Sequence, residues 1–93
     1  MKKIWKFPID PNSVEDKWET IEVEMPYGAK PLHVGSKDDR VYIWAEVDPD
    51  EFRKQSKFFY SIGTGHGAVP PDSTYFGTVF QDGYVWHIYQ DIE

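Results

Sequence analysis

The segment from Gly63 to Gly67 has the composition most suited to binding a ligand. It reads Gly-Thr-Gly-His-Gly. Glycine adopts positive φ readily and lets a ligand approach the backbone, and a run of N–H groups in such a loop can form an anion-binding nest. A threonine adds a hydroxyl, and a histidine adds a donor that becomes cationic close to neutral pH. The pattern predicts contact with a phosphate or a similar anion through four residues: Gly63, Thr64, Gly65 and His66.

The same loop also has a purely structural interpretation, in which the glycines only permit the chain to reverse direction. The sequence lacks the Gly-Lys-Ser/Thr of a P-loop, and no helical pattern follows as it would in a dinucleotide-binding fingerprint. The residues alone therefore leave two interpretations open, a ligand or partner contact and a wide turn.

Metal binding and catalysis need residue patterns that this sequence lacks. The histidines, His33, His66 and His87, lie on separate segments and are never two or four residues apart. The absence of cysteine excludes a thiol nucleophile, a disulfide scaffold and a zinc site made of thiolates. No Gly-x-Ser-x-Gly motif is present, and the acidic clusters fit a hairpin tip, a turn and a solvated strand face. We therefore expect no enzymatic activity, no metal and no cofactor.

Aromatic side chains interleaved with cations form a second candidate feature. Lysines alternate with apolar residues over residues 2–7, and Arg53 lies shortly before Phe58. Rings and cations in this arrangement can stack a base and pair with phosphate, although solvated strand and helix faces have the same composition. For a nucleotide-type ligand we expect Trp44 or Trp86 to stack on the base and Arg53 to pair with its charge.

The length and charge of the chain restrict the classes of protein to which it can belong. Its 93 residues suffice for a single domain, residues 1–93, with a small core. Sixteen acidic and ten basic residues give a net charge of −6, which excludes a protein that coats long nucleic acid or a membrane by bulk charge. The apolar runs are too short to span a bilayer, and no signal peptide is visible after Met1. We expect a soluble cytosolic protein.

Alternation of apolar and polar residues with a period of two predicts an all-β fold. Six Phe, six Tyr and four Trp suit a pleated, half-buried surface. The pattern predicts about seven short strands, at residues 2–7, 18–25, 32–35, 40–47, 57–63, 74–80 and 84–90. Hairpin turns are predicted at Ser36-Lys37-Asp38-Asp39 and at Gln81-Asp82-Gly83. Hairpins make neighbouring strands antiparallel, so we expect a compact β-sandwich or a partly open barrel. At most one short helix is expected, after Asp48, where an N-cap residue precedes a proline and a glutamate.

The predicted strands have more apolar positions than a single core can bury. One face is predicted to form the core: Ile21, Val23, Leu32, Val34, Val41, Ile43, Ala45, Phe58, Tyr60 and Val85. The opposite faces also carry apolar and aromatic side chains: Tyr42, Trp44, Phe76, Phe80, Trp86 and Ile88. A second copy of the chain, a ligand or another segment would have to cover them, so we expect a homo-oligomer.

Several short blocks of the sequence are similar to those of one protein family. They are Ile4-Trp5-Lys6-Phe7, Trp44-Ala45-Glu46-Val47-Asp48, Gly63-Thr64-Gly65-His66, Gly77-Thr78 and Val85-Trp86-His87-Ile88-Tyr89. Together they span nearly the whole chain, which resembles a family of small bacteriophage-encoded proteins classed as a domain of unknown function. The chain departs from the family pattern after His66, where Gly67-Ala68 replaces the usual proline, so the loop geometry is expected to differ.

The resemblance implies a phage accessory protein that acts in the cytoplasm of the host bacterium. By analogy with phage proteins of this size, it implies an anti-defence role. One expectation is a non-enzymatic sponge that sequesters a nucleotide-type immune signalling molecule. The alternative is a protein-binding inhibitor that blocks a host defence complex, as anti-CRISPR proteins do, through an aromatic and acidic surface. The expected partners are accordingly a small anionic nucleotide-type ligand or a host defence protein.

Overall fold

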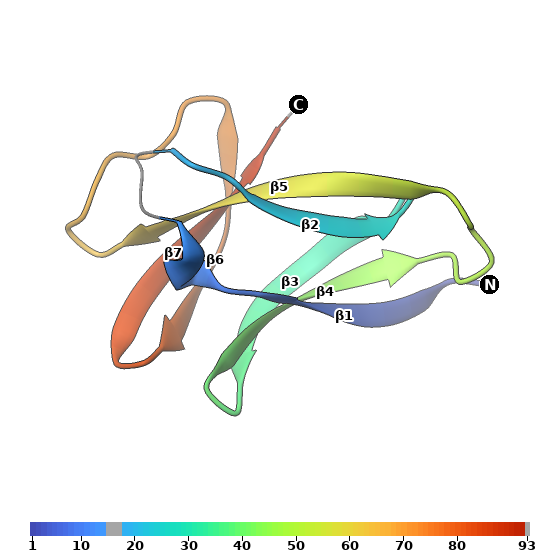
Figure 1. Cartoon of the computed structure of the whole chain (residues 1–93), viewed down its shortest axis with the longest axis horizontal. Helices are drawn as coiled ribbons and strands as arrows, with labels where there is room; N and C mark the ends of the chain where they lie inside the picture. The colour runs from blue at the N-terminus through green and yellow to red at the C-terminus, as the bar shows by residue number, and fades with distance from the viewer. Residues whose placement is uncertain (15–17, 93) are drawn as a thin grey trace.

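The computed structural model describes residues 1–14 and 18–92 and places seven strands within them (Figure 1). The strands are β1 Lys3–Ile9, β2 Ile21–Pro26, β3 Lys30–Lys37, β4 Arg40–Val47, β5 Lys54–Gly63, β6 Ser73–Gln81 and β7 Tyr84–Asp91. A single 3₁₀ turn, η1, covers Pro11–Ser13 in this part of the chain. Each strand overlaps a range that the sequence predicts.

The strands form two antiparallel sheets, which confirms the predicted all-β fold and fits a β-sandwich. The order is β1-β4-β3 in the three-stranded sheet and β2-β5-β7-β6 in the four-stranded sheet. In Figure 1, β2 runs beside β5 and β1 runs beside β4, as these pairings require. The molecule measures 41 × 30 × 18 Å.

β4 shows how the alternation of residues builds the core. Its odd-numbered residues from Val41 to Val47 are buried, whereas its even-numbered residues point to the outer face of the sheet. Full burial of a Val or Ile side chain contributes roughly 1.5–3 kcal/mol, so this central strand anchors the three-stranded sheet. The described core comprises Ile9, Ile21, Val23, Met25, Ala29, Val34, Val41, Ile43, Ala45, Val47, Phe59, Val79 and Ile88.

Three prolines lie inside strands, and each of these strands is at the edge of a sheet. Pro8 is in β1, Pro26 is in β2 and Pro31 is in β3. An edge strand has one side free of ladder hydrogen bonds, so a residue without an N–H is tolerated there. The prediction that the first strand stops before Pro8 is therefore wrong. Pro8 pairs with Tyr42, and β1 continues to Ile9.

Two tight hairpins form where the sequence predicts them. Asp38 and Asp39 connect β3 to β4, and Asp82 and Gly83 connect β6 to β7, all with positive φ. Two-residue loops of this kind match the right-handed twist of the flanking strands. The tips touch, since the Asp82 N–H donates to Oδ1 of Asp39 at 3.2 Å and the Gln81 side-chain amide donates to the Asp39 carbonyl at 3.3 Å. The hairpins therefore join the two sheets.

The short helix expected after Asp48 does not form. Oδ1 of Asp48 accepts from the Asp50 N–H and the Asp48 carbonyl accepts from the Glu51 N–H, both at 3.0 Å, so the capping contacts exist. The chain turns only once, and β5 begins at Lys54 instead of residue 57. A helix here could bury only one apolar side chain, Phe52, and that side chain is 87% exposed. Residues 54–59 instead pair with β2 along their whole length, which favours the strand.

The buried face of β5 is opposite to the prediction. Phe59 is fully buried, whereas Phe58 and Tyr60 are half-buried on the outer face of the sheet. Rings occupy both faces of this strand, so alternation cannot choose between them. The pairing of Phe59 with Ile21, which is also buried, makes the choice.

Other positions also differ from the sequence-based expectation. In β7, Ile88 is buried and Trp86 packs against the core, so Val85 faces outward. Leu32 lies at a bulge in β3 and is 42% exposed. The second strand begins at Ile21 and not at residue 18, because Trp18 has a positive φ of 60°, which is incompatible with an extended strand.

The two sheets approach most closely where β6 passes β3. A Cβ atom on Gly77 would lie only 2.5 Å from Cγ1 of Val34, a buried core residue. Nearby, the Ser36 hydroxyl donates to the Phe80 carbonyl at 2.8 Å and accepts from the Phe80 N–H at 3.2 Å. A residue without a side chain is therefore needed at position 77 to keep these edge strands in contact.

Candidate functional site

A hollow of about 480 Å³ lies beyond the C-terminal end of β5, where the four-stranded sheet meets η1. This volume is within the roughly 300–1,000 Å³ of small-molecule sites. The lining comes from three places: η1, the end of β5 with the loop after it, and the β6–β7 hairpin with the start of β7. The residues are Asn12, Gly63, Thr64, His66, Gly83, Tyr84, Val85 and Trp86. Four of the residues predicted to bind a ligand therefore line the same hollow: Gly63, Thr64, His66 and Trp86.

Gly63 gives this hollow a surface of bare backbone beside aromatic rings. A Cβ atom built on Gly63 would lie 3.4 Å from Cδ2 of His66 and 3.7 Å from Cζ3 of Trp86. The Tyr84 ring follows, with its centroid 6.0 Å from that of Trp86. Because position 63 has no side chain, the space beside the His66 and Trp86 rings is open to a planar ligand.

The loop from Gly63 to Gly67 reverses the chain through glycines with positive φ. Gly65 has φ 79° and Gly67 has φ 95°. Two of its N–H groups already have acceptors, since Thr64 donates to the Val85 carbonyl at 3.4 Å and His66 donates to the Gly63 carbonyl at 2.9 Å. Neither is available to bind an anion in this conformation. The polar groups that the loop offers a ligand are therefore mainly side chains, and Gly65 itself serves the turn.

The Thr64 hydroxyl is held by a chain of polar side chains on the outer face of the four-stranded sheet. Its Oγ1 lies 2.7 Å from Nε2 of His87, and Nδ1 of His87 lies 3.1 Å from Oγ1 of Thr78. Thr78 in turn contacts the Tyr75 hydroxyl. A neutral imidazole donates from one nitrogen and accepts at the other, so both His87 nitrogens are satisfied here. His87 thus positions Thr64 at the mouth of the hollow.

Trp86 carries an unmet donor in the wall of the hollow. Its Nε1 is buried and has no hydrogen-bond partner among the residues that the structure describes. Most buried polar groups in proteins have a partner, because desolvation of an unpaired donor costs free energy.

Trp44 and Arg53, the remaining predicted ligand contacts, lie away from the hollow. Trp44 is on the outer face of the three-stranded sheet, with its ring centroid 5.9 Å from those of Tyr42 and His33. Arg53 precedes β5, at the opposite end of that strand from Gly63. The structure therefore does not unite the predicted stacking and charge-pairing residues in one site.

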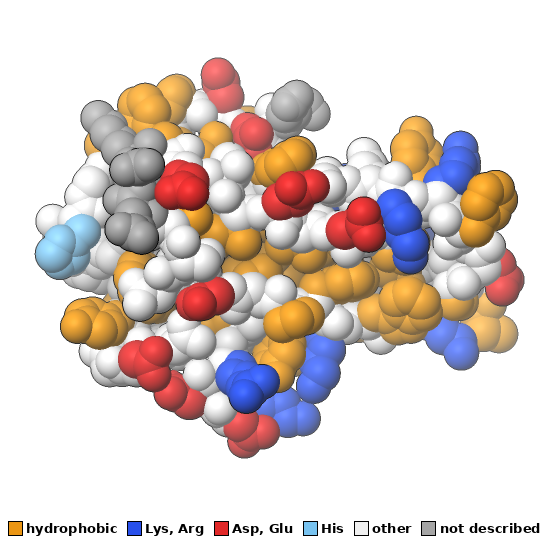
Figure 2. All heavy atoms as spheres, viewed as in Figure 1, with side chains coloured by type: hydrophobic (Ala, Val, Ile, Leu, Met, Phe, Trp, Pro, Cys, Tyr) orange, Lys and Arg blue, Asp and Glu red, His pale blue; other side chains and the backbone are white. Residues whose placement is uncertain are grey.

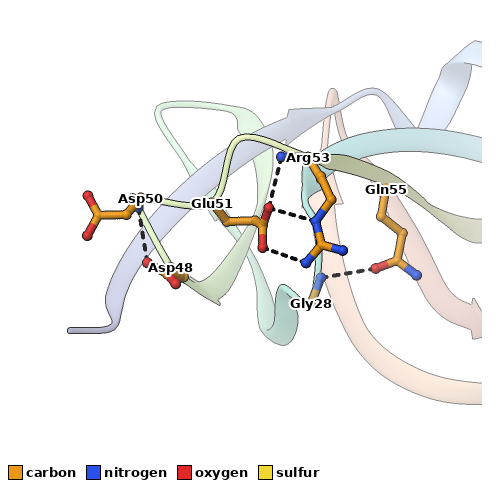
Figure 3. Close-up of polar contacts among 6 residues, drawn as sticks. All are labelled: Gly28, Asp48, Asp50, Glu51, Arg53 and Gln55. Carbon is orange, nitrogen blue, oxygen red and sulfur yellow. Dashed lines mark hydrogen bonds and ion pairs between the residues drawn. The ribbon is translucent and has the colours of Figure 1, made fainter.

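Arg53 has a local partner instead, as Figure 3 shows. Its guanidinium donates twice to the Glu51 carboxylate, each time at 3.0 Å, and lies 4.4 Å from the centroid of the Tyr27 ring. Through these hydrogen bonds Arg53 lowers the pKa of Glu51 to about 2. The cation and the carboxylate close the turn between β4 and β5, with Gln55 accepting from the Gly28 N–H beside them.

Sequence reasoning missed other residues that line the hollow, above all Asn12 and Tyr84. Tyr84 directly follows the Asp82-Gly83 hairpin signal, and this position beside a predicted turn could have identified it as a site residue. Nothing in the local sequence pattern marks Asn12 as a site residue. It lies at the hollow because a hydrogen bond from the Ser61 hydroxyl to the Pro11 carbonyl holds η1 against β5.

Another hollow of about 480 Å³ lies near the N-terminal half of β5 and the end of β7. It contains Lys57 and Phe58, but also Asp91. An anionic ligand there would meet a carboxylate of like charge, so this hollow fits the predicted chemistry less well.

Residues 1–14 and 18–92 contain neither a metal-binding cluster nor a membrane-spanning helix. No group of three or more His, Cys, Asp or Glu side chains in this range is arranged to hold a metal ion. No helix in it is long and apolar enough to cross a membrane.

The comparisons with known proteins place the chain in a family. No match was found among curated proteins or among solved structures. A family model described as "Domain of unknown function (DUF7352)" matches residues 1–93, which is the full length of the sequence. The chain therefore belongs to the DUF7352 family.

Proposed function

We propose that this protein is a non-enzymatic binder of a small nucleotide-type ligand. The observation that carries the proposal is the hollow at the end of β5, where backbone without side chain meets aromatic rings and polar side chains. Ligand sites combine such apolar walls with a few placed polar groups. The hollow combines bare backbone, aromatic rings and a few polar side chains, and binding is the function that this combination supports.

Five residues of the hollow take part in the proposed complex. The base lies over Gly63 and contacts the edges of Trp86 and Tyr84, because the π-face of a base can meet the edge of an aromatic ring. His66, which is exposed, and the Thr64 hydroxyl face the sugar and phosphate.

We further propose that binding sequesters a nucleotide-type immune signal in the cytoplasm of a bacterium infected by a phage that encodes this protein. The support for this context is the similarity of the sequence blocks to small phage-encoded proteins. A protein that only sequesters its ligand needs high affinity and no turnover.

A specific observation also favours the alternative, an inhibitor that binds a host defence protein. The outer face of the four-stranded sheet presents a cross-strand row of tyrosines, Tyr60, Tyr89 and Tyr75, and the exposed Phe80. Protein-binding hot spots are enriched in Tyr and Trp. In this alternative the aromatic face, and not the hollow, is the functional surface.

Isothermal titration with a panel of cyclic mono- and dinucleotides tests the proposal. We expect at least one to bind with a Kd at or below the micromolar range and with one ligand per hollow. Gly63→Val places a branched side chain between His66 and Trp86 and should abolish binding, and His66→Ala should weaken it about ten-fold or more. Phe80→Ala, on the outer face, is the matched control and should bind as the wild type does.

The proposal is wrong if no nucleotide of the panel produces heat, or if Gly63→Val binds as tightly as the wild type. A loss of binding in Phe80→Ala that equals the loss in His66→Ala would transfer the site to the aromatic face. Circular dichroism of each variant separates a loss of binding from a loss of fold.

A further inference from the structure

The outer face of the three-stranded sheet carries a second set of rings and cations, separate from the hollow. Because the odd-numbered residues of β4 face the core, Tyr42 and Trp44 face outward. The register places Lys6 of β1 and His33 of β3 on either side of Trp44, in one row across the sheet. The neighbouring row contains Tyr42 and Gly35.

These side chains form a contiguous cluster. The Trp44 ring centroid lies 5.9 Å from that of His33 and 5.9 Å from that of Tyr42. Nζ of Lys6 lies 4.6 Å from the centre of the Tyr42 ring, within cation–π distance. A Cβ atom on Gly35 would lie 3.1 Å from Nε2 of His33 and 3.3 Å from Cζ3 of Trp44. Both rings therefore pack against the backbone of this glycine.

The charge of this face is opposite to that of the whole chain. Glu46 is the one carboxylate on an outward position of these three strands. Four cations occupy outward positions of the same strands: Lys6, Lys30, Lys37 and Arg40. Within the described chain the ion pair found is Arg53–Glu51, so these four cations have no carboxylate partner there. Figure 2 shows Lys and Arg side chains at the lower tip, beside Asp and Glu side chains, where Figure 1 places the β3–β4 hairpin.

We propose that this face binds a short single-stranded nucleic acid. Bases stack on Trp44 and His33, and phosphates pair with the surrounding Lys and Arg side chains. Flat sheets that present aromatic rings among cations bind single strands in this way, because base stacking is sequence-tolerant and cations track the backbone. The proposal goes beyond the nucleotide hollow, since the rings belong to the other sheet.

The dimensions and charge favour a short single strand over a duplex. From Arg40 to Glu46 the face extends about 20 Å along β4 at ~3.3 Å per residue. A platform of this length suits the lower end of the roughly 4–16 nucleotides that compact β-domains cover. A long duplex would bring many phosphates close to a chain of net charge −6, with four cations to offset them. An acidic protein would pair with the cations but would leave the stacked rings unused.

Fluorescence anisotropy with a labelled oligo-dT of about twelve nucleotides tests this proposal at low salt. The full chain should bind the oligonucleotide, and affinity should fall as salt rises. The double variant Lys6→Glu/Arg40→Glu should weaken binding about ten-fold or more and reduce the salt slope by about 1.4, at ~0.7 per lost phosphate contact. Trp44→Leu should also weaken binding about ten-fold, but with an unchanged salt slope, because it removes stacking.

Lys54→Glu is the matched charge reversal, on an exposed strand residue of the other sheet. It should bind the oligonucleotide as the wild type does, and so should Gly63→Val. The proposal is overturned if the wild type does not bind, or if Lys54→Glu weakens binding as much as the double variant does. It is also overturned if a duplex binds equally, or if polyglutamate displaces the probe as well as unlabelled oligo-dT does, which would indicate a surface for acidic proteins. Circular dichroism confirms that each variant is folded.

Discussion

At the scale of single residues, the contact between Asp39 and Asp82 shows how charge acts at the junction of the two hairpins. The Asp82 N–H donates to the Asp39 carboxylate, and a hydrogen bond between their side chains, together with the negative charge of Asp39, raises the pKa of Asp82 above its ordinary value of 3.8. A carboxyl group with a raised pKa in the folded state stabilises the fold while it is protonated. That contribution is lost as pH rises through the raised pKa.

Replacing Asp82 by Asn should therefore stabilise the protein at neutral pH. Asparagine keeps the side-chain size, tolerates the positive φ of 53° and removes the repulsion from Asp39. Thermal unfolding should show a higher Tm for Asp82→Asn than for the wild type at about pH 7, and this difference should disappear near pH 3, where Asp82 is protonated. A gain in Tm that is equal at both pH values would instead assign the effect to the turn preference of Asn-Gly.

At the scale of elements, the residues Lys57-Phe58-Phe59-Tyr60 of β5 show where alternation ceases to be informative. Rings stand on both faces, and the hydrophobic pattern alone gives no reason to prefer one. Pairing with β2 places Phe59 against the buried Ile21 and leaves Phe58 opposite Glu22 on the outer face. The neighbour in the sheet, which comes from elsewhere in the sequence, decides which ring is in the core.

Phe59→Ala should accordingly destabilise the fold by about 3–5 kcal/mol, because it removes a fully buried ring and leaves a cavity. Phe58→Ala is the matched control on the same strand and should cost clearly less, since that ring is only half-buried. Chemical denaturation of both variants measures the two free energies of unfolding. Equal losses would contradict the register of β5.

Gly77→Ala should destabilise the protein by about 1–3 kcal/mol through overpacking. The added methyl group would lie 2.5 Å from Cγ1 of Val34, and the branched side chain of a buried valine cannot move aside cheaply. The double variant Gly77→Ala/Val34→Ala should lose less than the sum of the single variants, because removing the valine methyls makes room. Additive losses would indicate that the two strands are not in contact here.

At the scale of the whole molecule, the two sheets present different outer surfaces. The three-stranded sheet combines Trp44 with unpaired cations, whereas the four-stranded sheet combines tyrosines with Glu22 and Glu24 of β2. The net charge of −6 conceals this separation. A chain that is acidic on average can therefore still offer one face to an anionic partner.

We expect the protein to self-associate through the aromatic face of the four-stranded sheet. Tyr75 and Phe80 are 55% and 63% exposed on this face, and large apolar side chains left exposed favour an interaction site. Light scattering at micromolar concentration should give a mass of at least two chains, and Tyr75→Glu/Phe80→Glu should shift it toward one chain. A monomer of the wild type at that concentration would leave the face to another partner.

The sequence by itself determined the features that depend on neighbouring residues. Period-two alternation predicted the seven strands and the all-β fold, and Asp-Asp and Asp-Gly predicted the hairpins, because strand preference and turn conformation are local properties of the backbone. The glycines also indicated that the loop could adopt positive φ, as Gly65 does, while its function as a site or a turn stayed open.

Only the tertiary structure decided which faces are buried and which distant residues meet. Gly63, His66 and Trp86 line one hollow together with Asn12 of η1. Trp44 and Arg53 lie elsewhere, beside His33 and Glu51 respectively. These outcomes follow from strand order and register, which pair segments far apart in the chain. A shift of one residue in register turns every side chain to the other face, so local pattern cannot fix them.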